Sequence, residues 1–544
     1  MANPSDSSTP RGEAFVWFTG LGLIVGLGMV VGLLALVLMN GATVFWAPRV
    51  PVAQVDDGRV LIGQLAQRRV RAGSPADQPR YERQYQVGLR ELNGNSYLWI
   101  DESKIRAEEF PADILGLERV ENGPAFVRPR SLRKSDGRTI LVADPAFEEA
   151  FQAEVAAAAV VREKLVEITR HRIGDVNAAM DKARVALRRA EDLKLAEEAA
   201  GLRKEIAGLD ARFAALQEEA KLVVAGGAVA SLVSQDAAGR EVVVPLTQVI
   251  RAWFPNRLDT WGRVRLFASR LGEFLFDEPR EANTEGGLMP AIFGTLVMTV
   301  FMSLLVTPFG VITAIYLREY ARQGALLRVV RISVNNLAGV PSIVFGVFGL
   351  GFFVYVLGGS IDQLLFSDQL KYNNNTPVFG TGGLLWCSLT LALMTLPVVI
   401  VATEEALAAV PRGMREASLA TGASKWQTIR DILLPASAPG ILTGVILAMA
   451  RGAGEVAPLM LVGVVKLAPT LPFDGSAPFL HMDRKFMHLG FHVYDLGFQS
   501  PDSDAARPMV FATTLLLIIL VVCLNLGAIW IRNRLRARYK GASF

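Results

Sequence analysis

The chain has 544 residues, of which 51% are hydrophobic and 20% are charged. This composition is too apolar for an ordinary soluble protein and too charged for one that lies wholly in lipid, so membrane and aqueous parts are expected. The net charge is only +4 and the Lys and Arg are spread along the chain, which gives no support to nucleic-acid binding. Cys387 and Cys523 lie inside apolar runs, which is typical of small buried side chains and not of a disulfide or a metal site.

Apolar stretches long enough to cross a bilayer, which takes about 20 helical residues, predict six membrane spans. They are Ala14–Met39, Leu288–Leu317, Ser333–Gly358, Gly383–Thr403, Ser437–Leu459 and Pro508–Ile531. The first is longer than the apolar part of a signal peptide, about 7–15 residues, so it is predicted to be a retained helix. Arginines follow the second and sixth spans, and positive loops stay cytoplasmic. Both termini are therefore predicted to be cytoplasmic, and residues 42–285 periplasmic.

Residues 42–285 form an insertion that is large enough to bury a core of its own. Short alternating runs separated by Gly, Asn and Pro predict a strand-rich part over residues 50–142. Ala, Glu, Lys, Arg and Leu dominate residues 145–220, with leucines at mostly helical spacing. That pattern predicts a helical arm, a hairpin or coiled coil, with its break at Gly174 or Gly201.

The last part of the insertion, residues 222–280, is predicted to hold a strand and an amphipathic helix. In the helical stretch Leu258–Phe276, an aromatic and aliphatic face lies opposite several arginines. Such a helix suits the outer surface of the membrane, and it suits packing on the preceding domain equally well. The pattern predicts the helix but does not decide whether it packs on the membrane surface or on the preceding domain.

A short motif follows the fourth span. Glu416–Gly422 reads EASLATG, and Ile432–Pro435 reads ILLP after a spacing of nine residues. Helix-forming residues lead to Gly422, which is typical of a helix that ends in a left-handed turn, and Ser424 can cap the next helix. The motif resembles the EAA loop of ABC importer permeases, with Ser418 in place of the second alanine.

The resemblance implies a fold class and a mechanical role. The implied fold is that of an all-α polytopic membrane protein, the six-helix type I ABC importer permease, which carries here a large mixed α/β periplasmic insertion with a long helical or coiled-coil segment. In the family the short helix of this loop, here within residues 404–435, fits into a groove on the ATPase subunit. The residues that the resemblance assigns to ATPase coupling are Glu416, Ala417, Ser418, Gly422, Ile432, Leu434 and Pro435.

Three further segments resemble the phosphate-specific transport permeases, in particular their A-type (PstA) family. They are Asn335–Gly346, Leu396–Val399 and Ala450–Leu459. The resemblance implies that a permease core at residues 286–532 moves inorganic phosphate across the inner membrane. Residues 1–41 are then a cytoplasmic N-terminus and the first span, and residues 533–544 a basic cytoplasmic tail.

The implied partners are a second, C-type permease, an ATPase dimer and a periplasmic phosphate-binding protein, with membrane lipid around them and no nucleic acid. The chain holds no G-x-x-x-x-G-K-[ST] pattern, so nothing in it is expected to cradle the phosphates of ATP. No cofactor is expected on this chain. ATP and Mg are expected on the partner ATPase, and the chain is predicted not to be an enzyme by itself.

Arg451 and Glu455 are the predicted substrate-pathway residues. A charged side chain inside a membrane span costs about 2.5–3.5 kcal/mol and indicates a functional site. The planar guanidinium of Arg451 donates paired hydrogen bonds that match a tetrahedral oxyanion. Glu455 is predicted one helical turn further on, where it would neutralise Arg451 while the pathway is empty. A purely structural ion pair is the alternative.

Other functions fit part of the pattern. The EAA loop is shared by importers of sulfate, molybdate and organic solutes, and a membrane signalling scaffold is the alternative from a different class. His488 and His492 have the i, i+4 spacing of a metal pair but no clear third ligand. They are therefore predicted to lie in a solvated outer loop, without a metal.

Overall fold

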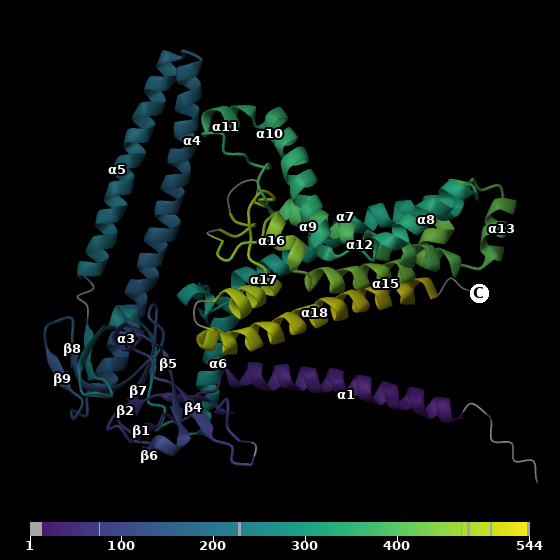
Figure 1. The fold of residues 1–544 in the computed structure, drawn as a ribbon. Coiled ribbons are helices and arrows are strands. Elements are labelled where there is room, and N and C mark those ends of the chain that lie inside the picture. The colour runs from purple at the N-terminus through teal and green to yellow at the C-terminus, as the bar shows by residue number, and fades with distance from the viewer. Residues whose placement is uncertain are drawn as a thin grey trace, which may run out of the picture.

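The computed structural model describes residues 13–75, 77–226, 230–468, 470–475, 479–500 and 503–540. Figure 1 shows a bundle of long helices that carries, at one end, a body of strands and a long helical arm. Residues 1–12 of the predicted N-terminal segment and residues 541–544 of the predicted C-terminal tail lie outside the described residues.

Six helices of the described residues are long and apolar enough to cross a membrane, as predicted. They are Trp17–Thr43, Met289–Tyr320, Ser342–Leu365, Leu384–Ala408, Lys425–Ala453 and Ala506–Ala537. The first lies in α1 (Glu13–Thr43), the fourth is α12 (Leu384–Ala408), and the sixth lies in α18 (Ser503–Lys540). Because α18 is helical to Lys540, the tail predicted from residue 533 begins as the last turns of this helix and not as a separate segment.

The third span begins later than the predicted Ser333–Gly358. The span consists of α9 (Ser342–Phe348), the π-helical stretch Gly349–Gly358 and α10 (Gly359–Leu365). Before it come α7 (Met289–Ile315) with its π-helical continuation Tyr316–Tyr320, and α8 (Ala325–Leu337). After it comes α11 (Ser367–Tyr372). Between α8 and α9 the helix is broken at residues 338–341. Pro341 lacks an amide hydrogen and disfavours helical backbone at the residue before it, so the break falls there.

The fifth span also differs from the prediction, Ser437–Leu459. It is built, in chain order, from α14 (Lys425–Thr428), the π-helical stretch Ile429–Leu433 and α15 (Leu434–Ala453). Residues 454–456 are not helical, and a separate short helix, α16 (Ala457–Val462), follows them. Two glycines and a proline within seven residues of the sequence weaken the helix at this point. The prediction of one continuous helix through Arg451 and Glu455 is wrong.

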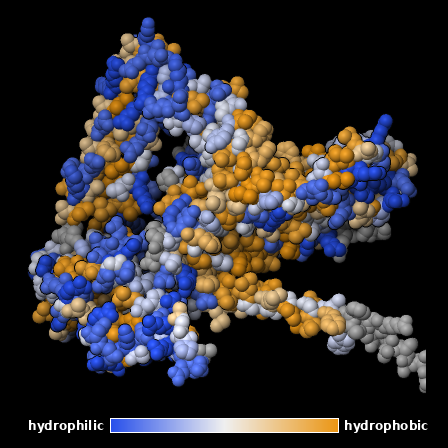
Figure 2. Space-filling model, in the orientation of Figure 1, coloured by the Kyte–Doolittle hydropathy of each residue, from blue (hydrophilic) through white to orange (hydrophobic). Residues whose placement is uncertain are grey.

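The bundle is organised around α12, which is the most buried of the six spans. Its core cluster joins α12 to α7, α15 and α16 through Met302, Leu391, Ala448 and Leu459. α1 lies at the edge, where Gly41 meets Phe511 and Leu515 of α18, and most of its apolar side chains are exposed. Figure 2 shows this contrast: hydrophobic residues cover the bundle, and hydrophilic ones cover much of the arm and the strand body.

The strand body between the first two spans holds antiparallel sheets. The main one has the order β11-β10-β8-β7-β12 with β9 beside β8, and the smaller ones are β2-β1-β6, β3-β4-β5 and β13-β14. The strands are β1 Val52–Val55, β2 Val60–Ile62, β3 Gln64–Val70, β4 Tyr81–Gln86, β5 Tyr97–Asp101, β6 Ile105–Glu109, β7 Leu115–Arg119, β8 Ala125–Arg133, β9 Thr139–Leu141, β10 Ser231–Gln235, β11 Glu241–Pro245, β12 Val249–Trp253, β13 Pro279–Arg280 and β14 Glu285–Gly286. A short helix, α2 (Arg90–Asn93), joins β4 to β5.

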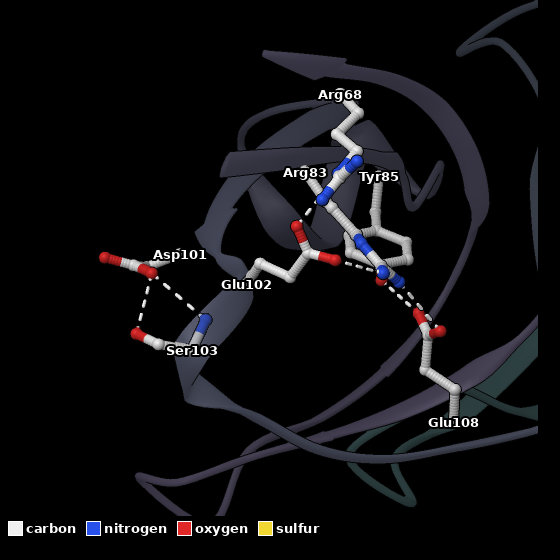
Figure 3. A network of polar contacts seen from close by, with 7 residues as sticks. All are labelled: Arg68, Arg83, Tyr85, Asp101, Glu102, Ser103 and Glu108. Carbon is white, nitrogen blue, oxygen red and sulfur yellow. Dashed lines mark hydrogen bonds and ion pairs between the residues drawn. The ribbon is translucent and has the colours of Figure 1, made fainter. Parts of the chain in front are cut away.

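A polar network ties two of the small sheets together (Figure 3). Arg83 on β4 forms ion pairs with Glu102, just after β5, and with Glu108 on β6, the latter at 2.9 Å between Nη1 and Oε2. The Tyr85 hydroxyl also donates to Glu108. Burial, together with this bond, raises the pKa of Tyr85 to about 12, so the hydroxyl keeps its proton and remains a donor at neutral pH.

The arm leaves the strand body after β9 and returns to it before β10. It consists of α3 (Phe147–Val166), the π-helical stretch Glu167–Arg172, α4 (Ile173–Asp192) and α5 (Ala196–Gly226). The hairpin turn is at residues 193–195, where Lys194 has a φ of 56°. The predicted breaks at Gly174 and Gly201 are therefore wrong, because both glycines lie inside helices.

The amphipathic stretch forms α6 (Thr260–Phe276), which connects the strand body to the bundle. Leu266 lies in a cluster with Val52, Phe126 and other residues of the strand body. Phe274 packs with residues of the bundle, including Leu288 and Met509. These contacts favour the alternative in which the helix packs on the preceding domain, and they place it as the junction between the two parts.

Candidate coupling loop and transport pathway

The predicted helix, turn and helix of the EAA-like motif lie at the end of the bundle far from the strand body (Figure 1). α13 covers Arg412–Ala420, and Gly422 just beyond it takes a φ of +87°. Ser424 caps α14: its hydroxyl accepts from the Gln427 amide, and its own amide donates to the Gln427 side chain at 2.7 Å. The predicted left-handed turn and helix cap are confirmed.

Glu319, at the end of the second span, clamps this loop. Its side chain is almost fully buried and forms an ion pair with Arg415 of α13, at 2.8 Å between Nη1 and Oε1. Arg415 also donates to the Leu407 carbonyl at 3.0 Å. Lys425 of α14 donates to the Glu319 carbonyl. Both short helices are thus fixed to the bundle by the end of one span, a role of Glu319 that the sequence analysis did not predict.

Ser418, the serine in place of the expected alanine, supports the turn from inside. Its hydroxyl lies 2.9 Å from the Thr428 hydroxyl, so it links α13 to α14 across the turn. Below them lies a buried cluster formed by Ile315, Leu407, Val410, Ile429 and Leu433, with Leu434 partly buried against it. The substitution therefore adds a hydrogen bond at this position.

The outer surface of the loop is free for a partner. Glu416, Ala417 and Gly422 are exposed, and the side chain of Glu416 makes no hydrogen bond or ion pair with another described residue. Leu419 and Trp426 are 51% and 53% exposed, so two large apolar side chains lie on this surface. Ile432, Leu434 and Pro435 are half-buried and belong to the support beneath. The loop is a rigid projection with an apolar tip.

The two predicted pathway residues lie close together, although not on one helix. Arg451 is in the last turn of α15, and Glu455 lies in the break after it. Nε of Arg451 and Oε1 of Glu455 are 3.7 Å apart, and the two side chains are 36% and 21% exposed. At this distance and exposure the pair is loose, so the guanidinium keeps donors that an oxyanion can use.

The break beside this pair packs closely against the third span. A Cβ at Gly346 of α9 would lie 2.7 Å from Cα of Pro458 of α16, so only glycine permits the approach. Leu337 and Val340, at the break before the third span, pack on the same core cluster as Leu459. The break before the third span and the break after the fifth therefore meet inside the bundle, and non-helical backbone is tolerated there because protein surrounds it.

The histidine pair is not in a solvated loop, so that prediction is wrong. His488 and His492 are 1% and 2% exposed, next to and within α17 (Leu489–Tyr494). Nδ1 of His488 accepts from the Gly490 amide at 3.1 Å. Burial lowers the pKa of His488 to about 3 and that of His492 to about 4, so both are neutral. Among the described residues no group of three or more His, Cys, Asp or Glu is placed to hold a metal ion.

Asp362 is a further buried charged residue, and the sequence analysis did not single it out. It lies in α10 with 1% of its surface exposed. Its carboxylate accepts from the amides of Val378, Phe379 and Gly380, at 3.0, 2.8 and 2.7 Å. Because its partners are amides 16 to 18 residues away, no local signal in the sequence indicates this role.

These features define the class of protein as a polytopic membrane protein with an exposed, EAA-like loop. The family model described as "binding-protein-dependent transport system inner membrane component" matches residues 306–540. The insertion lies outside that match.

Curated relatives agree with the family model. The phosphate transport system permease protein PstA 1 of Mycobacterium tuberculosis (strain CDC 1551 / Oshkosh) is 36% identical over 248 residues, which are 45% of this chain and 71% of the relative. The probable ABC transporter permease protein YqgH of Bacillus subtilis (strain 168) is 35% identical over 198 residues, 36% of this chain and 59% of the relative. The chain belongs to this family of ABC transporter permeases, in its PstA-type branch, and is a multi-pass inner-membrane protein.

Solved structures include a chain of the MetNI methionine ABC transporter in an inward-facing conformation. It is 20% identical and covers 46% of this chain and 95% of its own length, with a TM-score of 0.32. That score is too low to define a shared fold.

Proposed function

We propose that this chain is the PstA-type permease subunit of an ATP-driven importer that moves inorganic phosphate across the inner membrane. Its partners are a second, C-type permease, an ATPase dimer and a periplasmic phosphate-binding protein. ATP and Mg²⁺ bind to the ATPase, and this chain contributes half of the membrane pathway and one coupling loop. The relatives named as phosphate transport permeases support the choice of cargo.

The observation that carries the proposal is the Arg451–Glu455 pair at the break after α15. A guanidinium inside the membrane is costly, and a tetrahedral oxyanion repays the cost with paired charge-assisted hydrogen bonds. Glu455 holds the charge balanced while the pathway is empty and gives way when phosphate arrives. The break gives both side chains a backbone that can shift without unwinding a whole helix.

The coupling loop supports the same function. α13 projects from the bundle with the exposed, apolar Leu419 and Trp426, which suit a groove on the ATPase. This loop lies at the end of the bundle where α1 begins and α18 ends, and the strand body lies at the other end (Figure 1). With the ATPase in the cytoplasm, both termini are cytoplasmic and residues 42–285 are periplasmic.

The test is uptake of radiolabelled phosphate by the complete complex, reconstituted in proteoliposomes with the binding protein outside and ATP inside. Unlabelled phosphate should compete, whereas sulfate and molybdate should not. Transport of either of those anions in preference to phosphate would refute the cargo, and no uptake of any oxyanion would refute the function.

Arg451 can be tested in the same assay. Arg451→Gln should lower uptake by about 10- to 100-fold, because a charge-assisted hydrogen bond contributes about 1.5–3 kcal/mol. Arg451→Lys keeps the charge without the fork and should lie between that variant and the wild type. Arg534→Gln, an arginine near the end of α18, is the matched control. Wild-type uptake by Arg451→Gln would exclude Arg451 from the pathway.

A further inference from the structure

The tip of the arm is attached to the opposite side of the outer surface. α4 and α5 rise from the strand body, and the end of α4 reaches α11, between the third and fourth spans (Figure 1). Arg188 of α4 donates to the Tyr372 carbonyl at 2.9 Å and to Oδ1 of Asn374 at 2.8 Å. The arm, the strand body and the outer ends of the spans therefore form a closed arch.

Asp192 makes the second attachment at the tip. Its carboxylate accepts from the Tyr372 hydroxyl at 2.7 Å and pairs with the Lys371 ammonium. These two donors hold the pKa of Asp192 below its usual range, so the contact is fully charged at neutral pH. Tyr372 is buried, which makes this a docked contact and not a chance pair of surface charges.

The base of the arm is fixed to the strand body. Phe147 and Phe151 at the start of α3 are buried in the core of the main sheet. Arg162 donates to the carbonyls of Thr247 and Val249, at 3.1 and 2.8 Å. The arm is thus held at both ends, and the helical pair between them is stiff along its length.

The platform under the tip continues into the pathway. Asp362 of α10 binds the amides of residues 378–380, and the Trp386 indole of α12 donates to the Phe379 carbonyl at 2.7 Å. At Gly358 a Cβ would lie 2.1 Å from the same carbonyl oxygen. The outer half of the third span is therefore fixed to the start of the fourth.

The other half of the third span reaches the break that follows the fifth span. α9 and α10 form one membrane-crossing helix, and Gly346 of α9 lies against Pro458 of α16, three residues from Glu455. If this helix moves as a rigid element, a displacement at α11 reaches α16 through the contact at Gly346.

From this chain of contacts we propose that Arg188 and Asp192 are positioning residues for transport: by docking on α11, the arm holds the outer half of the third span, and through it α16, in register with Arg451 and Glu455. The proposal rests on the proposed function. The insertion then acts as a permanent brace of the permease and not as a receptor for the binding protein.

The first experiment measures uptake by the reconstituted complex while the concentration of binding protein is varied. Asp192→Lys and Arg188→Ala should each lower the maximal rate by about threefold or more and leave the half-maximal binding-protein concentration unchanged. The charge swap Asp192→Lys with Lys371→Asp should restore the rate. Arg203→Ala removes a pair with Glu191 inside the arm, at 2.6 Å, and serves as the control.

A second experiment tests whether the brace must release. Asp192→Cys with Lys371→Cys, in a chain whose Cys387 and Cys523 are replaced by Ala, allows the tip to be bridged with a bifunctional thiol reagent. The bridged complex should transport as fast as the wild type, because the bridge replaces the attachment that the two cysteine substitutions remove, and the unbridged variant should be slower. Loss of uptake on bridging would overturn the proposal, because the arm would then have to detach in each cycle.

Two further outcomes would also overturn it. One is a wild-type uptake rate in Asp192→Lys although its arm is detached. Detachment is shown when Arg188→Cys and Asn374→Cys, added to Asp192→Lys, no longer cross-link, and transport would then not depend on the arm. The other is a raised half-maximal binding-protein concentration at an unchanged maximal rate, which would make the arm a docking surface. The wild-type complex must carry phosphate in each series, so failure of the proposed function is recognised separately.

Discussion

Replacing Asp362 by alanine should loosen the outer connection between the third and fourth spans. The carboxylate accepts three amide hydrogen bonds of 2.7 to 3.0 Å. A buried donor left without its partner costs about 1–3 kcal/mol, so losing all three bonds should cost at least about 3 kcal/mol. Asp362→Asn offers one acceptor oxygen in place of two, and its amide nitrogen opposes one of the donors, so an intermediate loss is expected.

Amide hydrogen exchange of the purified complex, followed by mass spectrometry, measures this directly. In Asp362→Ala, the amides of residues 378–380 should exchange at least about 100-fold faster, since 3 kcal/mol corresponds to slightly more than two powers of ten. Gln363→Ala, an exposed position on the same helix, should behave as the wild type. If residues 378–380 stay protected in Asp362→Ala, the assigned role of the carboxylate is wrong, and with it one link between the arm and the pathway.

Three other perturbations have outcomes that follow from the structure. Gly422→Val forces a branched side chain into a φ of +87°, at a cost of about 1–2 kcal/mol. It should lower the ATPase activity that the binding protein stimulates, while co-purification shows that the complex still assembles. Unchanged stimulation would argue against a rigid loop. Gly346→Val places a side chain against Pro458 and should lower both the melting temperature and the uptake rate, because overpacking costs about 1–3 kcal/mol; a melting temperature equal to that of the wild type would contradict the tight approach. The melting temperature should be steady above pH 6.5 and fall below that pH. The reason is that His488 and His492 bind protons in the unfolded chain, whereas their buried side chains stay neutral in the folded one. The free energy of unfolding should then fall by about 1.4 kcal/mol per pH unit for each histidine. His488→Asn should flatten that profile, and an unaltered slope would show that His488 is protonated equally in both states.

The backbone geometry of the EAA-like loop was predictable in detail because its signals are local. Gly422 ends one helix by its own conformational freedom, and Ser424 begins the next with a capping partner three residues away. Both signals act within a few residues, where sequence and backbone correspond directly. The clamp by Glu319 was not predictable, since Arg415 is nearly a hundred residues away and an acid in a short loop is ordinarily solvated.

The broken spans show what hydropathy leaves out. Ser333–Gly358 and Ser437–Leu459 are apolar throughout most of their length, and a hydropathy pattern does not register whether the backbone is continuous. Pro341, Gly454 and Pro458 were the available signals, and prolines also occur in helices that only bend: Pro308 and Pro397 lie inside α7 and α12. Tertiary packing decides which proline breaks a helix.

The prediction for the arm was wrong in the opposite sense: its glycines predicted helix breaks where the helices are continuous. A glycine inside a helix costs only about 1 kcal/mol, and the hairpin recovers more than that from buried Met180 and Leu216 at the interface of α4 and α5. The real turn is at Lys194, a residue with no turn signature, because the length of the helical interface fixes where the chain reverses.

The breaks beside the third and fifth spans and the docking of the arm are physically connected. A continuous helix positions its outer half through its inner half, since every turn is bonded to the one before it. Because the break at residues 338–341 separates the third span from α8, α8 does not position that span, and contacts at its outer end must hold it. Asp362 supplies one such contact from within the bundle, and the docked tip at Asp192 supplies another from outside it. In the proposed pathway, we expect the break at residues 454–456 to give Arg451 and Glu455 room to move, and the docked arm to confine that movement to the break.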